Sequence, residues 1–277
     1  MDITYSDTRT LAWIAFGFYA ISFLVAFLSS LKDRPYLRPL FYISLITGLT
    51  FQSAGLYFRG LNLSAFPLTN IFEILQVTAW CTTFLILVIQ LRSRLRSLGL
   101  FGSAFVALIT IFSLSISNFD SYRPIADLIE LSKRANPWIE LHAALAIFAY
   151  SVFGLLAITS LMFLLQDYSL THKRFSGLFQ LLPSLKQLSS ISHILLLIGV
   201  ISLALSVILG TLTWLSQTVH VTVSKLVCAW ILFISYLNIL TLKEKQRCLP
   251  RSIAWACIIL FLFAMLTLWP LHLSLSS

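Results

Sequence analysis

The sequence predicts an all-α integral membrane protein with about eight transmembrane helices and both termini on the outer, extracytoplasmic side. Three observations support this fold class: the apolar content, the length of the apolar runs and the placement of the charges. Of 277 residues, 58% are hydrophobic and 10% are charged, whereas soluble domains are about 45–50% apolar and about 25% charged. Together with a count of 4 cysteines, this composition excludes a soluble enzyme, a disordered chain and a disulfide scaffold.

Each of eight apolar runs is long enough to cross a bilayer as a helix, which takes about 20 residues. None shows the strict alternation of a barrel strand. The runs lie at roughly 10–31, 37–58, 71–91, 98–117, 139–166, 190–213, 221–242 and 252–272. Two connections, 118–137 and 167–189, are long enough to contain interfacial or amphipathic segments. No linker or internal repeat divides the chain, so we predict a single membrane domain over residues 1–277.

The charges indicate which side of the membrane each loop occupies. Most of the 19 Lys and Arg residues fall in alternate connections: Lys32, Arg34, Arg38, Arg92, Arg94, Arg96, Lys173, Arg174, Lys186, Lys243, Lys245, Arg247 and Arg251. Short basic loops stay cytoplasmic, which places both termini outside and the protein in the bacterial inner (plasma) membrane as a multi-pass protein. The net charge of +9 is then a topology signal. We expect no nucleic-acid partner, because no basic stretch is interleaved with aromatic residues.

The sequence lacks the common motifs of redox and catalytic chemistry. It has no Cys-x-x-Cys or Cys-x-x-Cys-His motif, so it is neither a thiol exchanger nor itself a c-type cytochrome. It has no Walker A loop to power transport, and no nucleophile–base pair can be recognised from spacing. We therefore expect no enzyme activity. Cys81, Cys228 and Cys257 lie within the apolar runs, where cysteine is expected to be a small packing residue.

Ionisable and aromatic residues gather at the predicted outer ends of the runs, where ionisable groups suggest function. Arg59 ends the second run, Glu73 begins the third, His142 begins the fifth, Trp214 ends the sixth and His220 begins the seventh. Two histidines at matching depth on different helices can ligate one planar metal cofactor from opposite faces, as imidazoles do with haem iron. We therefore predict a haem b whose iron is bound by His142 and His220. The haem carboxylates favour a nearby cation such as Arg59.

Each candidate also has a structural alternative. Asn70 and Glu73 have the spacing of a capping box at a helix start, although Asn70, Glu73 and Trp80 also share one helical face that could contact a cofactor. His142 stands at a helix start, where interfacial histidines are common. His193, near the predicted cytoplasmic end of the sixth run, is expected to hydrogen-bond a neighbouring helix.

Several segments carry a family resemblance. Residues 66–73 read Phe-Pro-Leu-Thr-Asn-Ile-Phe-Glu and lead into Thr-Ala-Trp at 78–80. Residues 141–145 read Leu-His-Ala-Ala-Leu, residues 182–185 read Leu-Pro-Ser-Leu, and residues 220–222 read His-Val-Thr. These segments resemble the cytochrome c assembly protein family, whose members include CcsA, CcmC and HemX, and they are most similar to its HemX-like branch, which includes YpjD. The likeness spans about 50–235 and implies a membrane protein concerned with haem.

The resemblance also implies roles for particular residues. In CcsA and CcmC, a Trp-rich outer loop and flanking histidines present haem for attachment to apocytochrome c. By position, His142 and His220 match those flanking histidines. Residues 214–219 of this chain lack the Trp-Gly-x-Trp-x-Trp-Asp pattern of that loop. The HemX-like branch is similarly reduced, and its members are linked to control of tetrapyrrole synthesis through the level of glutamyl-tRNA reductase.

Three functions are therefore considered. The first is a haem-handling protein that assists cytochrome c biogenesis or haem trafficking, with the bilayer, haem and other cytochrome c assembly proteins as partners. The second is a HemX-like regulator or scaffold whose cytoplasmic basic loops contact a haem-biosynthesis enzyme. The third is a small-solute transporter, which the lack of Gly/Pro-broken spans and of a repeat disfavours.

Overall fold

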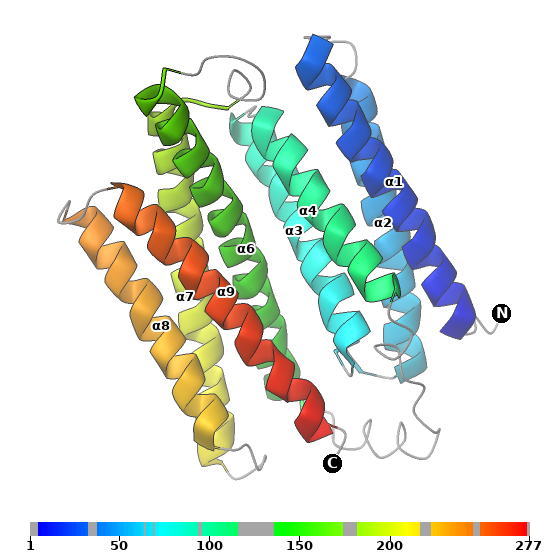
Figure 1. Ribbon diagram of the computed structural model, residues 1–277. Helices are drawn as coiled ribbons and strands as arrows, with labels where there is room; N and C mark the ends of the chain where they lie inside the picture. The colour runs from blue at the N-terminus through cyan, green and yellow to red at the C-terminus, as the bar shows by residue number, and fades with distance from the viewer. Residues whose placement is uncertain are drawn as a thin grey trace. The chain divides into compact units, whose positions relative to one another are not determined.

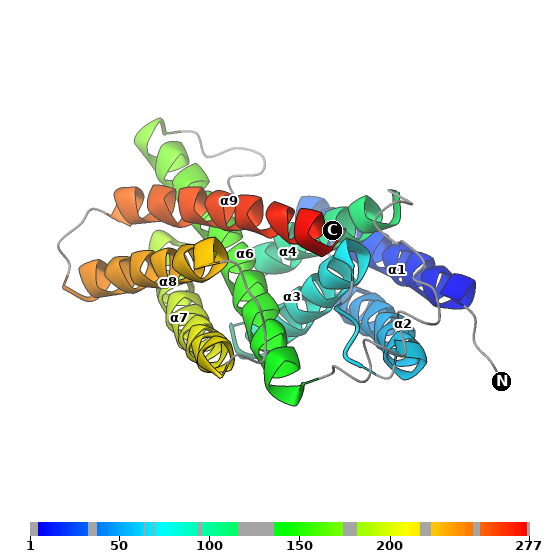
Figure 2. The same ribbon diagram turned by 90° about the horizontal axis from the view of Figure 1, so that it is seen from below.

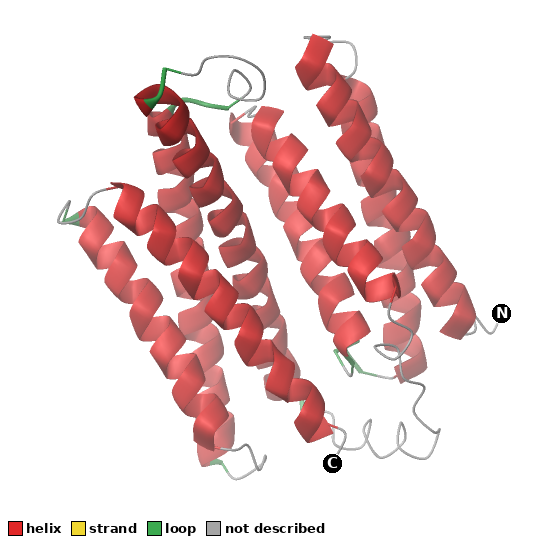
Figure 3. Cartoon of the chain, in the orientation of Figure 1, coloured by secondary structure: helices red, strands yellow, loops and turns green. Residues whose placement is uncertain are grey.

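The structure, a computed structural model, describes residues 5–32, 38–63, 65–68, 70–93, 96–115, 136–173, 182–216, 223–245 and 250–275. Over these residues the regular structure is all helical, with short loops and no strand (Figures 1 and 3). The chain divides into two compact units, Met1–Ala135 and Asn136–Ser277. The all-α prediction is confirmed.

Each predicted apolar run coincides with one helix. The first unit contains α1 (Tyr5–Lys32), α2 (Arg38–Leu63), α3 (Ile71–Ser93) and α4 (Arg96–Ser115). The second contains α6 (Pro137–Thr171), α7 (Leu185–Leu215), α8 (Val223–Glu244) and α9 (Pro250–Leu275). Within the described residues, seven of these helices are long and apolar enough to cross a membrane, and the apolar stretch of α9, Pro250–Leu266, is shorter. The protein is therefore a multi-pass membrane protein; the count of eight spans and the outward termini stay predictions.

The outer surfaces of the helices are suited to lipid rather than water. Large apolar side chains are widely exposed, for example Leu91 at 77% and Leu266 at 70%. Soluble proteins seldom expose extended apolar patches. The exposed apolar surface belongs to both units, which agrees with a chain surrounded by lipid along most of its length.

In the first unit, α1 packs against α2 and α4, and α3 packs against α4 and α2 (Figures 1 and 2). The close approach of α1 and α2 depends on Gly48, because a Cβ atom there would lie 2.7 Å from Cε1 of Tyr19. This position lets the Tyr19 ring lie fully buried against α2. Small residues at such crossings are typical of helix packing in membranes.

A chain of buried polar side chains connects all four helices of the first unit. The Tyr19 hydroxyl donates to Gln52 Oε1 (2.6 Å), Gln52 Nε2 donates to Gln76 Oε1 (2.7 Å), and Gln76 Nε2 donates to Ser113 Oγ (2.7 Å). All four side chains are buried. An unpaired polar group in an apolar medium is unfavourable, so this network favours the one arrangement of α1–α4 that satisfies it.

In the second unit, α6 packs along α7 and against α9, and α8 packs against α7 and α9. The Phe153 ring of α6 lies between two neighbours. It stacks on Tyr236 of α8, with ring centroids 3.7 Å apart, and its other neighbour is Gly199 of α7, where a Cβ atom would lie 2.4 Å from Phe153 Cε1. Gly199 is therefore required for this packing.

One of the two connections predicted to contain interfacial segments is corrected by the structure. In the connection 167–189, Asp167–Thr171 continue α6 and Leu185–Ser189 begin α7, so these residues are helix ends. The cause is a helix-start signal that the prediction overlooked: Ser184 and Gln187 form a capping box ahead of α7. Residues 116–135 and 174–181 lie outside the described residues.

Candidate functional site

Of the capping box predicted at the start of α3, the structure contains the hydrogen bond to the Asn70 side chain. The Asn70 side-chain oxygen accepts a hydrogen bond from the Glu73 backbone N–H at 2.8 Å, which makes Asn70 the N-cap of α3. The Glu73 carboxylate contacts another residue: its Oε1 lies 3.2 Å from Nη1 of Arg59 on α2. The pair is buried, with side-chain exposures of 1% for Arg59 and 0% for Glu73.

Arg59 is held by three elements of the first unit. Besides Glu73 on α3, its Nε donates to Thr8 Oγ1 on α1 (3.0 Å). Its guanidinium lies 4.4 Å from the ring centroid of Phe72, a cation–π geometry. The start of α1, the end of α2 and the start of α3 therefore meet at one end of the unit, as alternating spans require. Arg59 and Glu73 neutralise each other in the structure, and their predicted cofactor role stays a prediction.

Trp80 lies two turns beyond Glu73 on α3. Its indole N–H donates to Ser53 Oγ on α2 (2.7 Å), and its ring is parallel to that of Phe84, with centroids 5.8 Å apart. Trp80 is partly buried and Phe84 is exposed. The indole is thus fixed by α2 while the neighbouring ring reaches the surface of the unit.

His142 is fixed between α6 and α7 by a reciprocal pair of hydrogen bonds. Its Nδ1 lies 2.7 Å from the Ser206 carbonyl oxygen and 3.0 Å from Ser206 Oγ. Ser206 Oγ donates its own proton to the His142 carbonyl oxygen (3.0 Å). Because a carbonyl only accepts, Nδ1 carries a proton, so in the neutral form of this imidazole the lone pair is on Nε2. A neutral histidine with this tautomer, held through Nδ1–H by a backbone carbonyl, is the usual state of a metal-ligating imidazole.

The neighbouring positions of α7 leave room for the His142 ring. A Cβ atom at Gly210 would lie 2.7 Å from His142 Cε1 and 3.3 Å from Nε2, so glycine permits the ring to rest on the α7 backbone. Trp214 is one turn further along α7 and is partly buried. His142 and Trp214 therefore lie toward the same end of the packed pair α6 and α7, and their role in binding a cofactor stays a prediction.

Other parts of the predicted site are distributed differently. Arg59, Glu73 and Trp80 belong to the first unit, whereas His142 and Trp214 belong to the second. His220 lies outside the described residues, so the paired-histidine prediction is not tested. Among the described residues, no group of three His, Cys, Asp or Glu side chains could hold a metal ion. A haem iron needs fewer protein ligands than a bare metal ion, since the porphyrin supplies the equatorial ligands and the protein only the axial ones.

Several residues around these positions were not anticipated from the sequence. Thr8 accepts a hydrogen bond from Arg59, and the Ser206 carbonyl oxygen accepts one from His142. Ser53 accepts a hydrogen bond from the Trp80 indole. Serine and threonine are frequent in membrane helices, often bonded within their own helix, so no local signal distinguishes these three. Only the three-dimensional pairing of helices identifies them.

Comparison with known proteins agrees with the resemblance predicted from the motifs. The sequence pattern of the Cytochrome C assembly protein family matches residues 68–275. HemX of Brevibacillus brevis is 28% identical over 205 residues, which cover 74% of this chain and 73% of the relative. HemX of Bacillus subtilis (strain 168) is 25% identical over 234 residues, covering 82% and 83%. The family match includes the Asn70 cap, both His142 and Ser206, and helix α9. The chain belongs to the cytochrome c assembly protein family.

Proposed function

We propose that this protein handles haem in the membrane, assisting cytochrome c biogenesis or haem trafficking, and binds haem b at the outer leaflet through His142 and His220. The observation that carries the proposal is the hydrogen bond from His142 Nδ1 to the Ser206 carbonyl oxygen, which orients the ring and makes Nε2 the ligand nitrogen of the neutral imidazole. Membership of the cytochrome c assembly family supports the same cofactor. The role requires no covalent chemistry by this chain, so we propose that it is not an enzyme.

The residues around His142 fit an axial ligand better than a catalytic base. The imidazole is oriented by α7 through Ser206 and rests against Gly210, so its direction is set before any ligand binds. Leu141 beside it and Leu212 on α7 are exposed and apolar, as suits the porphyrin face. In this proposal haem is the molecule that the protein transfers or senses. The chain would contribute the axial nitrogen of His142 and an apolar surface for the porphyrin.

Spectroscopy of the purified protein tests this proposal. In mild detergent, titration with haemin should give the Soret and visible bands of a bis-imidazole haem at one haem per chain. His142→Ala and His220→Ala should each lose that spectrum, because either change removes an axial ligand. His172→Ala is the matched control: this exposed histidine follows the last residue of α6, and its ring contacts Tyr168 of that helix. If both variants bind haem with the wild-type spectrum, the proposed site is wrong.

A second candidate function is a HemX-like regulator acting on tetrapyrrole biosynthesis through its cytoplasmic loops. Similarity to two HemX proteins and the absence of a Trp-rich motif at residues 214–219 favour it. Lys173, at the end of the α6 region, is exposed. Loss of a haem-synthesis enzyme from detergent pull-downs on neutralising Lys173 and Arg174, with haem binding unchanged, would support this alternative.

A further inference from the structure

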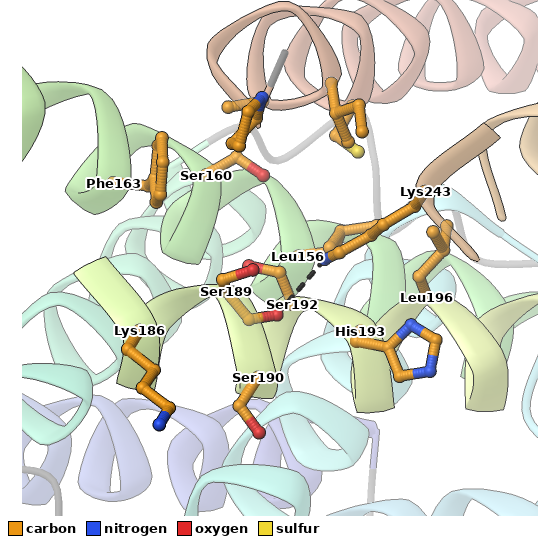
Figure 4. A pocket seen from close by; sticks show the side chains of 14 residues that line it. Leu156, Ser160, Phe163, Lys186, Ser189, Ser190, Ser192, His193, Leu196 and Lys243 are labelled. Atoms are coloured by element: carbon orange, nitrogen blue, oxygen red, sulfur yellow. Dashed lines mark hydrogen bonds between the residues drawn. The ribbon is translucent and has the colours of Figure 1, made fainter. Parts of the chain in front are cut away.

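A cavity of about 810 Å³ lies in the second unit at the helix ends opposite to His142 (Figure 4). It is formed where α6 and α8 end and where α7 and α9 begin. The basic loops predict this end to be cytoplasmic. The volume falls within the range of ligand pockets, roughly 300–1,000 Å³, so the cavity can hold more than ordered water.

The lining of the cavity includes basic side chains and several hydroxyl groups. Lys186, His193 and Lys243 line it together with Ser189, Ser192 and two further serines. Lys243 extends from α8 to α7, where its ammonium donates to the Ser189 carbonyl oxygen at 3.1 Å (Figure 4). Contrary to the sequence-based expectation, no hydrogen bond joins His193 to another helix among the described residues; His193 lines the cavity instead.

The positive charge of Lys243 has no anionic partner in the cavity. None of the described lining residues is a carboxylate. The acid at this end of α6, Asp167, lies 4.0 Å from Arg251 on α9. The Lys243 ammonium has three donors, of which the Ser189 carbonyl takes one. A partly buried cation in a membrane helix is unfavourable unless an anion or water compensates it, so the cavity favours an anionic ligand.

Apolar side chains lie among these polar residues in the cavity lining (Figure 4). Leu156, Phe163, Leu196 and Ile253 contribute to it. A small hydrophilic anion would leave this surface without a partner, whereas an acyl chain would cover it. Basic pockets between transmembrane helices on the cytoplasmic side are suited to anionic lipid headgroups. The lining therefore offers both cations for the headgroup of an acidic phospholipid and apolar surface for its acyl chain.

We propose that this cavity is a binding site for an acidic phospholipid, whose anionic headgroup contacts Lys243 and Lys186 and whose acyl chain covers the apolar lining residues. His193, Ser189 and Ser190 supply further donors to the phosphate oxygens, whereas the Ser192 hydroxyl already donates to the Leu188 carbonyl oxygen. This site is separate from the proposed haem site and does not depend on it, because its residues lie at the other end of α6 and α7. The lipid would join α6, α7, α8 and α9 at that end.

Native mass spectrometry of the full-length protein in mild detergent tests the proposal, with dioleoyl phosphatidylglycerol and dioleoyl phosphatidylcholine as competing probes. Wild-type protein should retain phosphatidylglycerol in preference. Lys243→Gln should weaken that binding about fivefold to tenfold, and Lys186→Gln/Lys243→Gln should abolish the preference. Lys245→Gln is the matched control, since it removes the same charge from an exposed lysine outside the cavity and should change affinity less than twofold.

A second variant separates lipid binding from folding. Ala254→Phe fills the cavity from α9 while keeping every charge, and it should also lose phosphatidylglycerol while the helical circular dichroism is unchanged. Equal binding of both lipids, or equal effects of Lys243→Gln and Lys245→Gln, would overturn the proposal. So would displacement of the lipid by millimolar inorganic phosphate, which indicates a free-phosphate site, or by stoichiometric haemin, which indicates a tetrapyrrole site.

Discussion

Replacing Glu73 by glutamine should lower the free energy of unfolding by about 3–5 kcal/mol, the usual effect of removing one partner from a buried ion pair. Glutamine keeps the shape of the side chain but removes the carboxylate that lies 3.2 Å from the guanidinium of Arg59, whose side chain is 1% exposed. Two further contacts of Arg59, Thr8 Oγ1 and the Phe72 ring, are neutral. The start of α1, the end of α2 and the start of α3 should therefore loosen together.

Reversible unfolding in mixed micelles of dodecyl sulfate and maltoside, followed by circular dichroism at 222 nm, measures this effect. Glu140→Gln is a matched control, since Glu140 occupies the first turn of α6 and is only partly buried; its effect should stay below about 0.5 kcal/mol. The double variant Arg59→Met/Glu73→Met should recover most of the loss, because no charge is left buried. A Glu73→Gln protein as stable as wild type would refute the ion pair as an organising contact.

Gly199→Ala should destabilise the second unit by about 1–3 kcal/mol, as overpacking of a filled interior does. The added methyl would lie 2.4 Å from Phe153 Cε1 and 2.9 Å from two further atoms of that ring. The ring cannot move away freely, because Tyr236 stacks on its other side at 3.7 Å. The expected response is separation of α7 from α6.

The matched control for this prediction is Gly17→Ala in α1, where a Cβ atom would meet nothing within 4 Å. Alanine is a better helix former than glycine by about 1 kcal/mol, so this variant should be neutral or slightly more stable. The same micelle unfolding assay compares the two. Equal effects at positions 17 and 199 would contradict the packing of Phe153 between Gly199 and Tyr236.

The sequence was sufficient to locate the helices because lipid makes apolar length and charge placement decisive. The run predicted at 71–91 corresponds to Ile71–Ser93, and the run at 139–166 to Pro137–Thr171. The ends were less well predicted, since helices continue past the apolar segment into polar residues. Ser184 is the example: its capping box starts α7 five residues ahead of the predicted run.

The sequence was less informative about which side chains meet. Arg59 and Glu73 were both assigned to the same end of their spans, and opposite charges at equal depth could have suggested the pair. No comparable signal connected Gln52 to Gln76 or His142 to Ser206, because each pair is joined by helix packing that periodicity does not specify. The basic cavity was similarly hidden: Lys243 is in the last turn of α8, where a lysine ordinarily reaches water.

The central claim, that His142 Nε2 is a haem ligand, is tested most directly by chemical rescue of His142→Gly. Haemin added to this variant should give the spectrum of a haem that lacks one axial imidazole. Added imidazole should then restore the wild-type bis-imidazole bands, because the space left by the side chain lies beside Ser206 and Gly210. His172→Gly should show the wild-type spectrum without imidazole. If His142→Gly itself retains the wild-type spectrum before imidazole is added, His142 is not a ligand and the proposed haem site is wrong.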